Sequence, residues 1–142
     1  MDIQELQYGN YINYKGKIIK VTSFCAKYNN EIKLNDIEDV YKIEPIELIP
    51  EMLEHNDFYY GYTADEEDLS YSIGASLPPD KKGWCWNEDG TIKVIFPKGS
   101  DGGLIQIDGT HYINFVFSEK IYVHQFQNLL KICGINKEIF IE

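Results

Sequence analysis

The sequence contains no arginine. All thirteen basic residues are lysines, against 23 acidic residues, and the net charge at pH 7 is −10. Arginine is the preferred side chain for bidentate contacts with phosphate and guanine. Its absence, together with the acidic balance, argues against a broad surface for nucleic acid. We therefore expect a small molecule or a protein as the partner, and no extended nucleic acid.

Cysteine is scarce, and long apolar runs are absent. Cys25, Cys85 and Cys133 are far apart, and no CxxC or Cys/His spacing indicates zinc. An odd number of cysteines without an export signal at the start favours a reducing cytoplasm. No apolar stretch approaches the length that crosses a membrane. We expect a cytoplasmic protein with buried thiols, no membrane contact, no metal and no cofactor.

Aromatic residues are abundant instead, at 14%, and eleven of them are tyrosines. Tyrosine suits half-buried strands and ligand-facing surfaces, because it joins an apolar ring to a polar tip. A β-rich fold accounts for most of these tyrosines, and exposed aromatics in such a fold also lead us to expect a homodimer.

Residues 36–68 carry twelve acids and one lysine, which favours a solvated face or, second, a docking surface for a basic partner.

The first 58 residues predict short strands and one short helix. Segments 10–14 and 17–24 flank a tight turn at Lys15-Gly16, and a second turn is expected before residues 32–34. Closely spaced short strands joined by tight turns predict an SH3-like small β barrel. Pro50 fits the first position of a short helix, which Asn56 would end.

The rest of the chain predicts an irregular loop over residues 59–83, followed by an antiparallel β-meander and a helix over residues 84–142. Hairpins are expected across residues 88–90 and across residues 108–110, where Asp-Gly is a strong turn signal. Residues 137–142 are expected to add a last edge strand. The fold class is therefore α+β, with three regions (1–58, 59–83 and 84–142) that can share one compact domain.

The segment IYVHQFQNLLKICGI, residues 121–135, has the clearest helical pattern. Its apolar residues fall at i, i+3, i+4 and i+7: Phe126, Leu129, Leu130 and Cys133. Cys133 therefore lies on the buried face near the negative end of the helix, where the pKa of a thiol rises. His124 lies at the helix start, where it can cap the helix or bond to a neighbouring strand. Gly134 ends the helix, and the segment is interpreted as structural.

Three stretches, YGNYINYKGKIIKV, IEPIELIPEMLEHNDF and YVHQFQNLLKICGINKEI, resemble a family of small uncharacterised proteins from phages and mobile elements of Bacteroides-type bacteria. The family's opening is matched by Gly9, Asn10, Tyr14 and Gly16. Its middle is matched by Pro45, Ile46, Leu48, Glu51 and Leu53, with Ile49 in place of the usual capping threonine. Its ending is matched by Tyr122, His124, Gln125, Gln127, Asn128 and Leu129. The resemblance implies an accessory protein of an infected or element-carrying bacterium, and it implies no catalytic residues.

Two segments and the loop tyrosines form the candidate ligand site. The segment 96–105 could turn several backbone N–H groups toward a phosphate, although a plain hairpin loop fits its pattern as well. The segment 81–86 combines lysines with tryptophans that could stack on a base, or that could fill the core. The acidic cluster 65–68 lacks the spacing of a calcium loop. The candidate ligand-binding residues are Lys81, Lys82, Trp84, Trp86, Lys98, Ser100, Tyr60 and Tyr62.

These features predict a non-catalytic binding protein that captures a small nucleotide-like ligand, with sequestration of a host defence signal as its use. The alternative is a protein–protein interaction module that acts on a host or phage protein. A third hypothesis, a phosphodiesterase or nuclease, requires His111 and His124 close together in a cleft.

Overall fold

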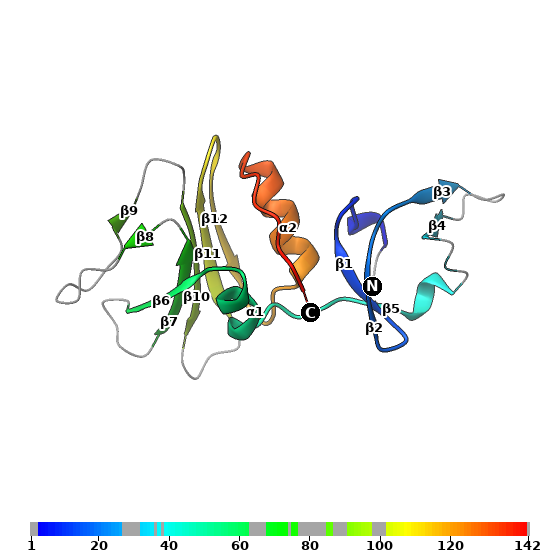
Figure 1. Ribbon diagram of the computed structural model, residues 1–142, viewed down its shortest axis with the longest axis horizontal. Coiled ribbons are helices and arrows are strands. Elements are labelled where there is room, and N and C mark those ends of the chain that lie inside the picture. Colours follow the sequence, from blue (N-terminus) through cyan, green and yellow to red (C-terminus); the bar gives the residue numbers. More distant parts are fainter. Residues whose placement is uncertain are drawn as a thin grey trace.

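The chain folds as an α+β protein in the computed structural model, which describes nine stretches of it. These are residues 3–26, 32–35, 37, 39–62, 68–73, 75–76, 85–86, 91–97 and 102–141. Only the backbone is described at residues 3, 25–26, 32–33, 59–62, 68–73, 75–76, 85–86, 91 and 97. Figure 1 shows a lobe with the first strands on the right, a five-stranded sheet on the left, and a helix between them.

The N-terminal lobe contains the expected short strands. Its elements are η1 (Ile3–Glu5), β1 (Tyr11–Tyr14), β2 (Lys17–Lys20), β3 (Phe24–Ala26), β4 (Ile32–Leu34), η3 (Val40–Lys42) and β5 (Ile43–Glu44). Strands β2, β1 and β5 form one antiparallel sheet in that order, and β3 pairs with β4. Lys15 and Gly16 have φ angles of 50° and 80°, as a two-residue hairpin of mirror-image type requires. The predicted Lys15-Gly16 turn is confirmed.

The C-terminal lobe contains the antiparallel meander, and two further strands join it. The sheet consists of β6 (Tyr59–Tyr62), β7 (Asp68–Ile73), β10 (Thr91–Pro97), β11 (Gly103–Asp108) and β12 (Tyr112–Phe117), in the order β12-β11-β10-β7-β6. The turn at residues 109–111 confirms the expected hairpin between β11 and β12. Alternate residues of β10 and β11, such as Ile92 and Ile105, are buried on one face.

Three expectations about strands were wrong. The range 59–83 is not an irregular loop, because β6, β7 and β8 (Ala75–Ser76) lie in it. β9 (Cys85–Trp86) does not form a hairpin with β10; it pairs with β8, because β7 and β11 already occupy both edges of β10. Residues 137–141 form no strand, because Phe140 bonds through both its backbone groups to the side-chain amide of Asn56 instead.

Two helices cover one face of this sheet. α1 (Pro50–His55) starts with Pro50 at its first turn and ends at Asn56, as expected, and it buries Leu53 completely. α2 (Val123–Ile132) begins after Tyr122, whose backbone N–H donates to the side-chain oxygen of Gln125. No helix among the described residues is long and apolar enough to span a membrane.

The C-terminal end of α2 packs against the β11–β12 turn. Ile135 N–H donates to the carbonyl of Leu130 at 2.9 Å and Gly134 N–H to that of Lys131 at 3.1 Å, which is a Schellman motif. Gly134 has a φ of 73°, and a Cβ added there would lie 2.6 Å from Oγ1 of Thr110. A glycine is therefore required both by the backbone conformation and by the close approach of the turn.

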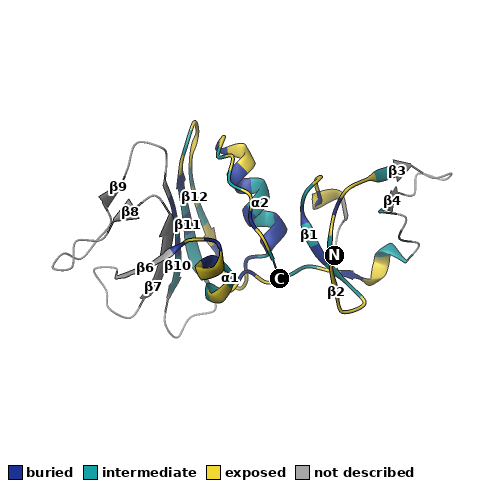
Figure 2. Ribbon diagram, in the orientation of Figure 1, coloured by how far each residue is buried: buried dark blue, intermediate teal, exposed yellow. Residues whose placement is uncertain are grey.

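Two separate apolar clusters stabilise the two lobes (Figure 2). The smaller cluster contains Leu6, Ile12, Val21, Leu34, Ile37 and Ile43 in the N-terminal lobe. The larger one lies between the five-stranded sheet and α2, and Phe126 is completely buried in it, 6.0 Å from the ring of Phe58. The two clusters have no buried residue in common, but Tyr11 of β1 packs against the larger cluster, and polar contacts join the lobes as well.

Candidate functional site

The predicted ligand residues lie outside the part of the chain whose side chains the structure describes. This holds for all eight: Lys81, Lys82, Trp84, Trp86, Lys98, Ser100, Tyr60 and Tyr62. Three backbone positions are described: Trp86 pairs with Ala75 between β9 and β8, and Tyr60 and Tyr62 pair with Tyr71 and Leu69 between β6 and β7. The side chains of Cys25 and Cys85 also lie outside it. The described residues point to a different place, the joint between the two lobes.

α2 has a second stripe, which is polar and faces the N-terminal lobe. Its members fall at i, i+3, i+4 and i+7, the same spacing as the apolar stripe: His124, Gln127, Asn128 and Lys131. Each of the four bonds to a residue between Glu5 and Tyr11. The helix thus uses one face for the sheet and the other for β1, which agrees with its position between them in Figure 1.

Gln127 makes the central contacts of this joint. Its Nε2 donates to the carbonyl of Gly9 at 3.0 Å, and its Oε1 accepts from the backbone N–H of Tyr11 at 3.1 Å. Asn10, which is completely buried, donates from Nδ2 to Gln127 at 3.4 Å and to Asn128 at 3.0 Å. A side-chain amide can both donate and accept, so Gln127 satisfies backbone groups of β1 and of the residue before it.

His124 is the buried ionisable group of the joint. Its Nε2 lies 3.3 Å from Oε2 of Glu5, and its ring stacks on that of Tyr122 with centroids 6.1 Å apart. Burial lowers the pKa of His124, while the hydrogen bond to Glu5 raises it by a smaller amount. Its Nδ1 is buried without a hydrogen-bond partner among the described residues. The sequence led us to expect a cap or a bond to a neighbouring strand, whereas the partner of His124 is Glu5 of η1.

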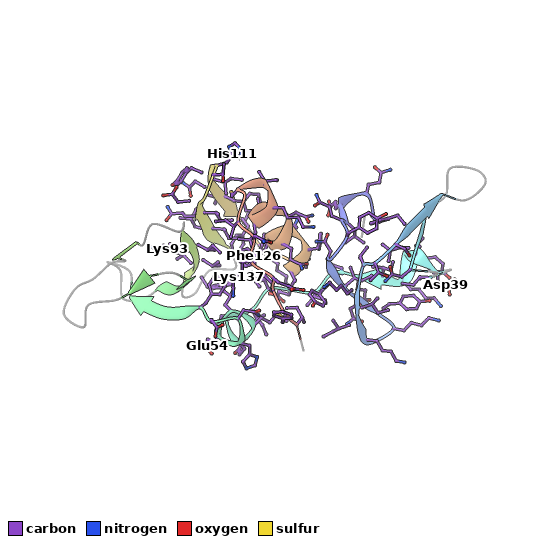
Figure 3. The ribbon with its side chains drawn as sticks, turned by 45° about the horizontal axis from the view of Figure 1, so that its top comes forward. Asp39, Glu54, Lys93, His111, Phe126 and Lys137 are labelled. Carbon is purple, nitrogen blue, oxygen red and sulfur yellow. The ribbon has the colours of Figure 1, made fainter. Side chains whose placement is uncertain are left out.

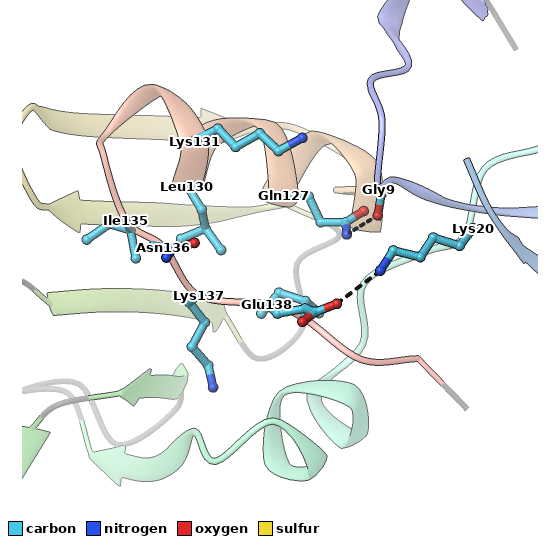
Figure 4. Close-up of a pocket in the computed structure, with 10 residues that line it drawn as sticks. Gly9, Lys20, Gln127, Leu130, Lys131, Ile135, Asn136, Lys137 and Glu138 are labelled. Carbon is cyan, nitrogen blue, oxygen red and sulfur yellow. Dashed lines mark hydrogen bonds and ion pairs between the residues drawn. The ribbon is translucent and has the colours of Figure 1, made fainter. Parts of the chain in front are cut away.

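Next to the joint, a cavity of about 220 Å³ opens between the N-terminal lobe and the segment that follows α2 (Figure 4). Three lysines and one glutamate line it: Lys20, Lys131, Lys137 and Glu138. Leu130, Ile135 and Ile139 supply an apolar wall, and Gly9, Gln127 and Asn136 supply polar groups. The cavity is therefore locally positive in a chain whose net charge is −10.

The three lysines differ in their contacts. Lys20 Nζ lies 3.0 Å from Glu138, and the hydrogen bond with this carboxylate raises the pKa of Lys20. Lys131 donates to the carbonyl of Tyr8 at 2.8 Å. Lys137 makes no ion pair or hydrogen bond within the described stretches, and Figure 4 shows its side chain directed away from the Lys20–Glu138 pair. Of the three lysines, Lys137 is thus the one that makes no contact of this kind within the described stretches.

The two histidines of the nuclease hypothesis do not meet. His111 lies at the tip of the β11–β12 hairpin (Figure 3), where its backbone N–H donates to the carbonyl of Cys133 at the end of α2. His124 is the second residue of α2. Nine residues of α-helix separate the two positions by about 14 Å. Among the described residues, no group of three or more metal-binding side chains exists either.

Cys133 is buried and free, as the sequence predicted. Burial raises the pKa of its thiol, because the thiolate would lose its solvent.

The polar stripe could have been found from the sequence. The helical spacing of His124, Gln127 and Asn128, on the side away from Phe126, indicates a second packed face. No protein-family model, no curated protein and no solved structure matches this chain.

Proposed function

We propose that this protein is a non-catalytic binding protein that captures a small nucleotide-like ligand. The observation that carries this proposal is the cavity beside α2, where Lys137 makes no ion pair with a described residue and where apolar side chains and the amides of Gln127 and Asn136 line the same space. A nucleotide fragment has the matching chemistry, because it joins a flat base to a phosphate. The cavity is smaller than the range of about 300–1,000 Å³ typical for drug-sized ligands, so the ligand is no larger than a mononucleotide or enters only in part.

Three points from the sequence support the same proposal. The resemblance to phage and mobile-element proteins gives it a use, the sequestration of a host defence signal, in the cytoplasm of an infected or element-carrying bacterium. The Trp84 and Lys98 segments remain a second predicted site, which can belong to the same ligand surface or compete with the cavity. The SH3-like barrel also remains a proposal for the N-terminal lobe, supported by the short strands that surround a single apolar cluster.

Thermal melting with a ligand panel tests the proposal. The panel contains inorganic phosphate, adenosine, mononucleotides, cyclic nucleotides and ADP-ribose derivatives, so that phosphate and base recognition are separated. A ligand at a hundred times its Kd stabilises the folded state by about 2.7 kcal/mol, which raises the Tm by roughly 5–11 °C in a domain of this size. Recovery of the intact ligand after incubation would exclude turnover.

Matched variants locate the site. Lys137→Ala removes the available cation of the cavity, and Lys15→Ala removes a lysine of the first hairpin, which lies 4.0 Å from Asp39. We expect Lys137→Ala to abolish the shift and Lys15→Ala to leave it unchanged. A shift lost only in Lys98→Ala or Trp84→Ala would assign the ligand to the loop segments instead. No shift with any ligand would refute ligand capture.

The alternative is a protein–protein interaction module. One observation favours it: large apolar side chains are exposed on the surface, among them Tyr41 at 75%, Val116 at 73% and Tyr112 at 64%. Exposed aromatic and apolar groups are typical of protein interfaces. Capture of a host or phage protein, lost on replacement of these side chains, would support this function.

A further inference from the structure

The last strand of the five-stranded sheet has an open edge. Among the described residues, β11 is the one strand that pairs with β12, through six residue pairs from Gly103–Phe117 to Asp108–Tyr112. The register advances by one residue on each strand throughout, so no β-bulge bends this edge away. An open strand presents unpaired backbone N–H and C=O groups, which are a template for another strand.

β12 also lacks the features that protect an edge. Its sequence, Tyr-Ile-Asn-Phe-Val-Phe, contains no charge, no proline and no glycine. The other outer strands differ: β2 has lysine at both ends, and β6 has four residues including Gly61. Val116 and Tyr112 on β12 are 73% and 64% exposed. A six-residue uncharged edge of this kind favours pairing with a further strand.

The pattern of β12 is complementary to itself. If a second β12 lies antiparallel to the first with the two copies of Asn114 opposite each other, Tyr112 faces Val116 of the second copy. In the same register, Ile113 faces Phe115. Both pairs join an aromatic to a β-branched residue, which are favourable cross-strand pairs, and the two amides can bond to each other. A two-fold axis at Asn114 thus pairs residues 112–116 with one another, and Phe117 falls opposite His111.

The charges at the two ends of β12 fit the same arrangement. The turn end carries Asp108 and His111, both exposed, and the other end carries Glu119 and Lys120, also exposed. An antiparallel pair places the turn end of one copy beside the other end of its mate. Asp108 itself lies on β11, one strand further from the mate, so the turn end offers His111 and the other end offers Glu119 and Lys120. A parallel pair would place like charges together instead.

We propose that β12 is a homodimer interface, in which two copies of this chain join their five-stranded sheets into one ten-stranded antiparallel sheet through β12–β12 pairing centred on Asn114. The inference is independent of the ligand cavity, which lies on the far side of α2 from this sheet edge and next to β1.

Sedimentation across a concentration series tests the proposal. The unmodified chain is expected to pass from monomer to dimer as its concentration rises. Val116→Lys places a charge on the edge at an exposed position and is expected to stay monomeric. Tyr41→Lys makes a comparable change at an exposed residue of η3, far from β12, and is expected to dimerise normally. Melting curves confirm that both variants are folded.

Disulfide trapping tests the register. Opposed Cα atoms in antiparallel strands lie about 4.5–5.5 Å apart, within the range that a disulfide spans. With Cys25 and Cys85 replaced by serine, diamide takes two hydrogens from a pair of thiols and leaves a disulfide. Asn114→Cys is expected to form a covalent dimer by itself. Val116→Cys is expected to remain uncoupled alone and to couple when mixed with Tyr112→Cys.

Three results would overturn the proposal. The first is an unmodified chain that is monomeric at every concentration tested. The second is a Val116→Lys variant that dimerises as well as the Tyr41→Lys control. The third is a result that contradicts a two-fold axis at Asn114. Such a result is an open-ended assembly in sedimentation, or a Val116→Cys variant that forms more covalent dimer by itself than Asn114→Cys does.

Discussion

Gln127 makes the central contacts of the joint between the lobes, and its removal is the sharpest test of the structure. Gln127→Ala removes the bond to the carbonyl of Gly9 and the bond from the N–H of Tyr11, together with the longer contact from Asn10. The two backbone groups then lose their partner at a half-buried position. We expect the variant to fold with a weakened joint.

The magnitude follows from these contacts. Leaving a buried backbone group without a partner costs about 1–3 kcal/mol, and water can reach a half-buried site and recover part of this. Two such groups therefore give a loss of about 2 kcal/mol in the free energy of unfolding. Gln127→Glu should destabilise the protein at least as much, because a carboxylate oxygen would replace Nε2 of Gln127. This nitrogen lies 3.0 Å from the carbonyl oxygen of Gly9, so two acceptors would then face each other.

Urea unfolding followed by circular dichroism and tryptophan fluorescence measures this loss. Ile132→Ala is the control, because Ile132 lies on the same helix at 59% exposure, and surface changes of this kind usually stay within about 0.5 kcal/mol. If Gln127→Ala unfolds with the same midpoint and slope as this control, the joint does not stabilise the protein and our reasoning is refuted. Two separate transitions would instead mean that the lobes unfold independently.

Three further predictions concern the core, the buried histidine and the helix end. Phe126→Ala should destabilise the protein by about 3–5 kcal/mol in the same urea assay, because Phe126 is completely buried; a loss under 1 kcal/mol would contradict its place in the core. Burial lowers the pKa of His124, so the unfolded chain binds a proton before the folded chain does as the pH falls below about 6.5, and the free energy of unfolding should decrease over that range. His124→Asn should flatten this dependence on pH. An unchanged profile would argue against burial of the neutral ring. Gly16→Ala and Gly134→Ala should each lower the free energy of unfolding by about 1 kcal/mol, because both glycines have a positive φ. Gly134→Ala should lower it by about 1 kcal/mol more, because its Cβ would contact Thr110. Equal Tm values for the two variants would contradict that contact.

Local signals in the sequence predicted local structure well. The Lys15-Gly16 and Asp108-Gly109 turns, the start of α1 at Pro50 and the apolar face of α2 around Phe126 were all expected, because turn chemistry and helical period are encoded in neighbouring residues. The expected helix end at Gly134 is confirmed for the same reason.

The choice of strand partners was not predictable in the same way. β7 has a clear alternation of Leu69, Tyr71 and Ile73 with serines, which was missed because acidic residues and glycines surround it. β9 was assigned to the nearest strand in sequence, but β10 prefers β7 and β11, and this preference is set by packing over the whole sheet.

The candidate site was located in the glycine-rich and tryptophan segments, and the cavity beside α2 was not expected. Its lining comes from Gly9, Lys20 and residues after position 126, which no spacing in the sequence connects. Only the polar stripe of α2, at the positions of Gln127 and Lys131, gave a local hint. A pocket whose lining residues lie more than 100 positions apart cannot be predicted from the local pattern of either segment.

The joint has a consequence for the order in which the protein is made. The residues that it connects, such as Asn10 and Gln127, lie 117 positions apart. At about 5–20 residues per second, a ribosome needs roughly 6 to 23 s to produce the second after the first. During that interval the first strands have no helix to dock against, and closing so long a loop is slow. Docking of the two lobes therefore comes only after α2 has been made, and the N-terminal lobe waits for its partner on the nascent chain.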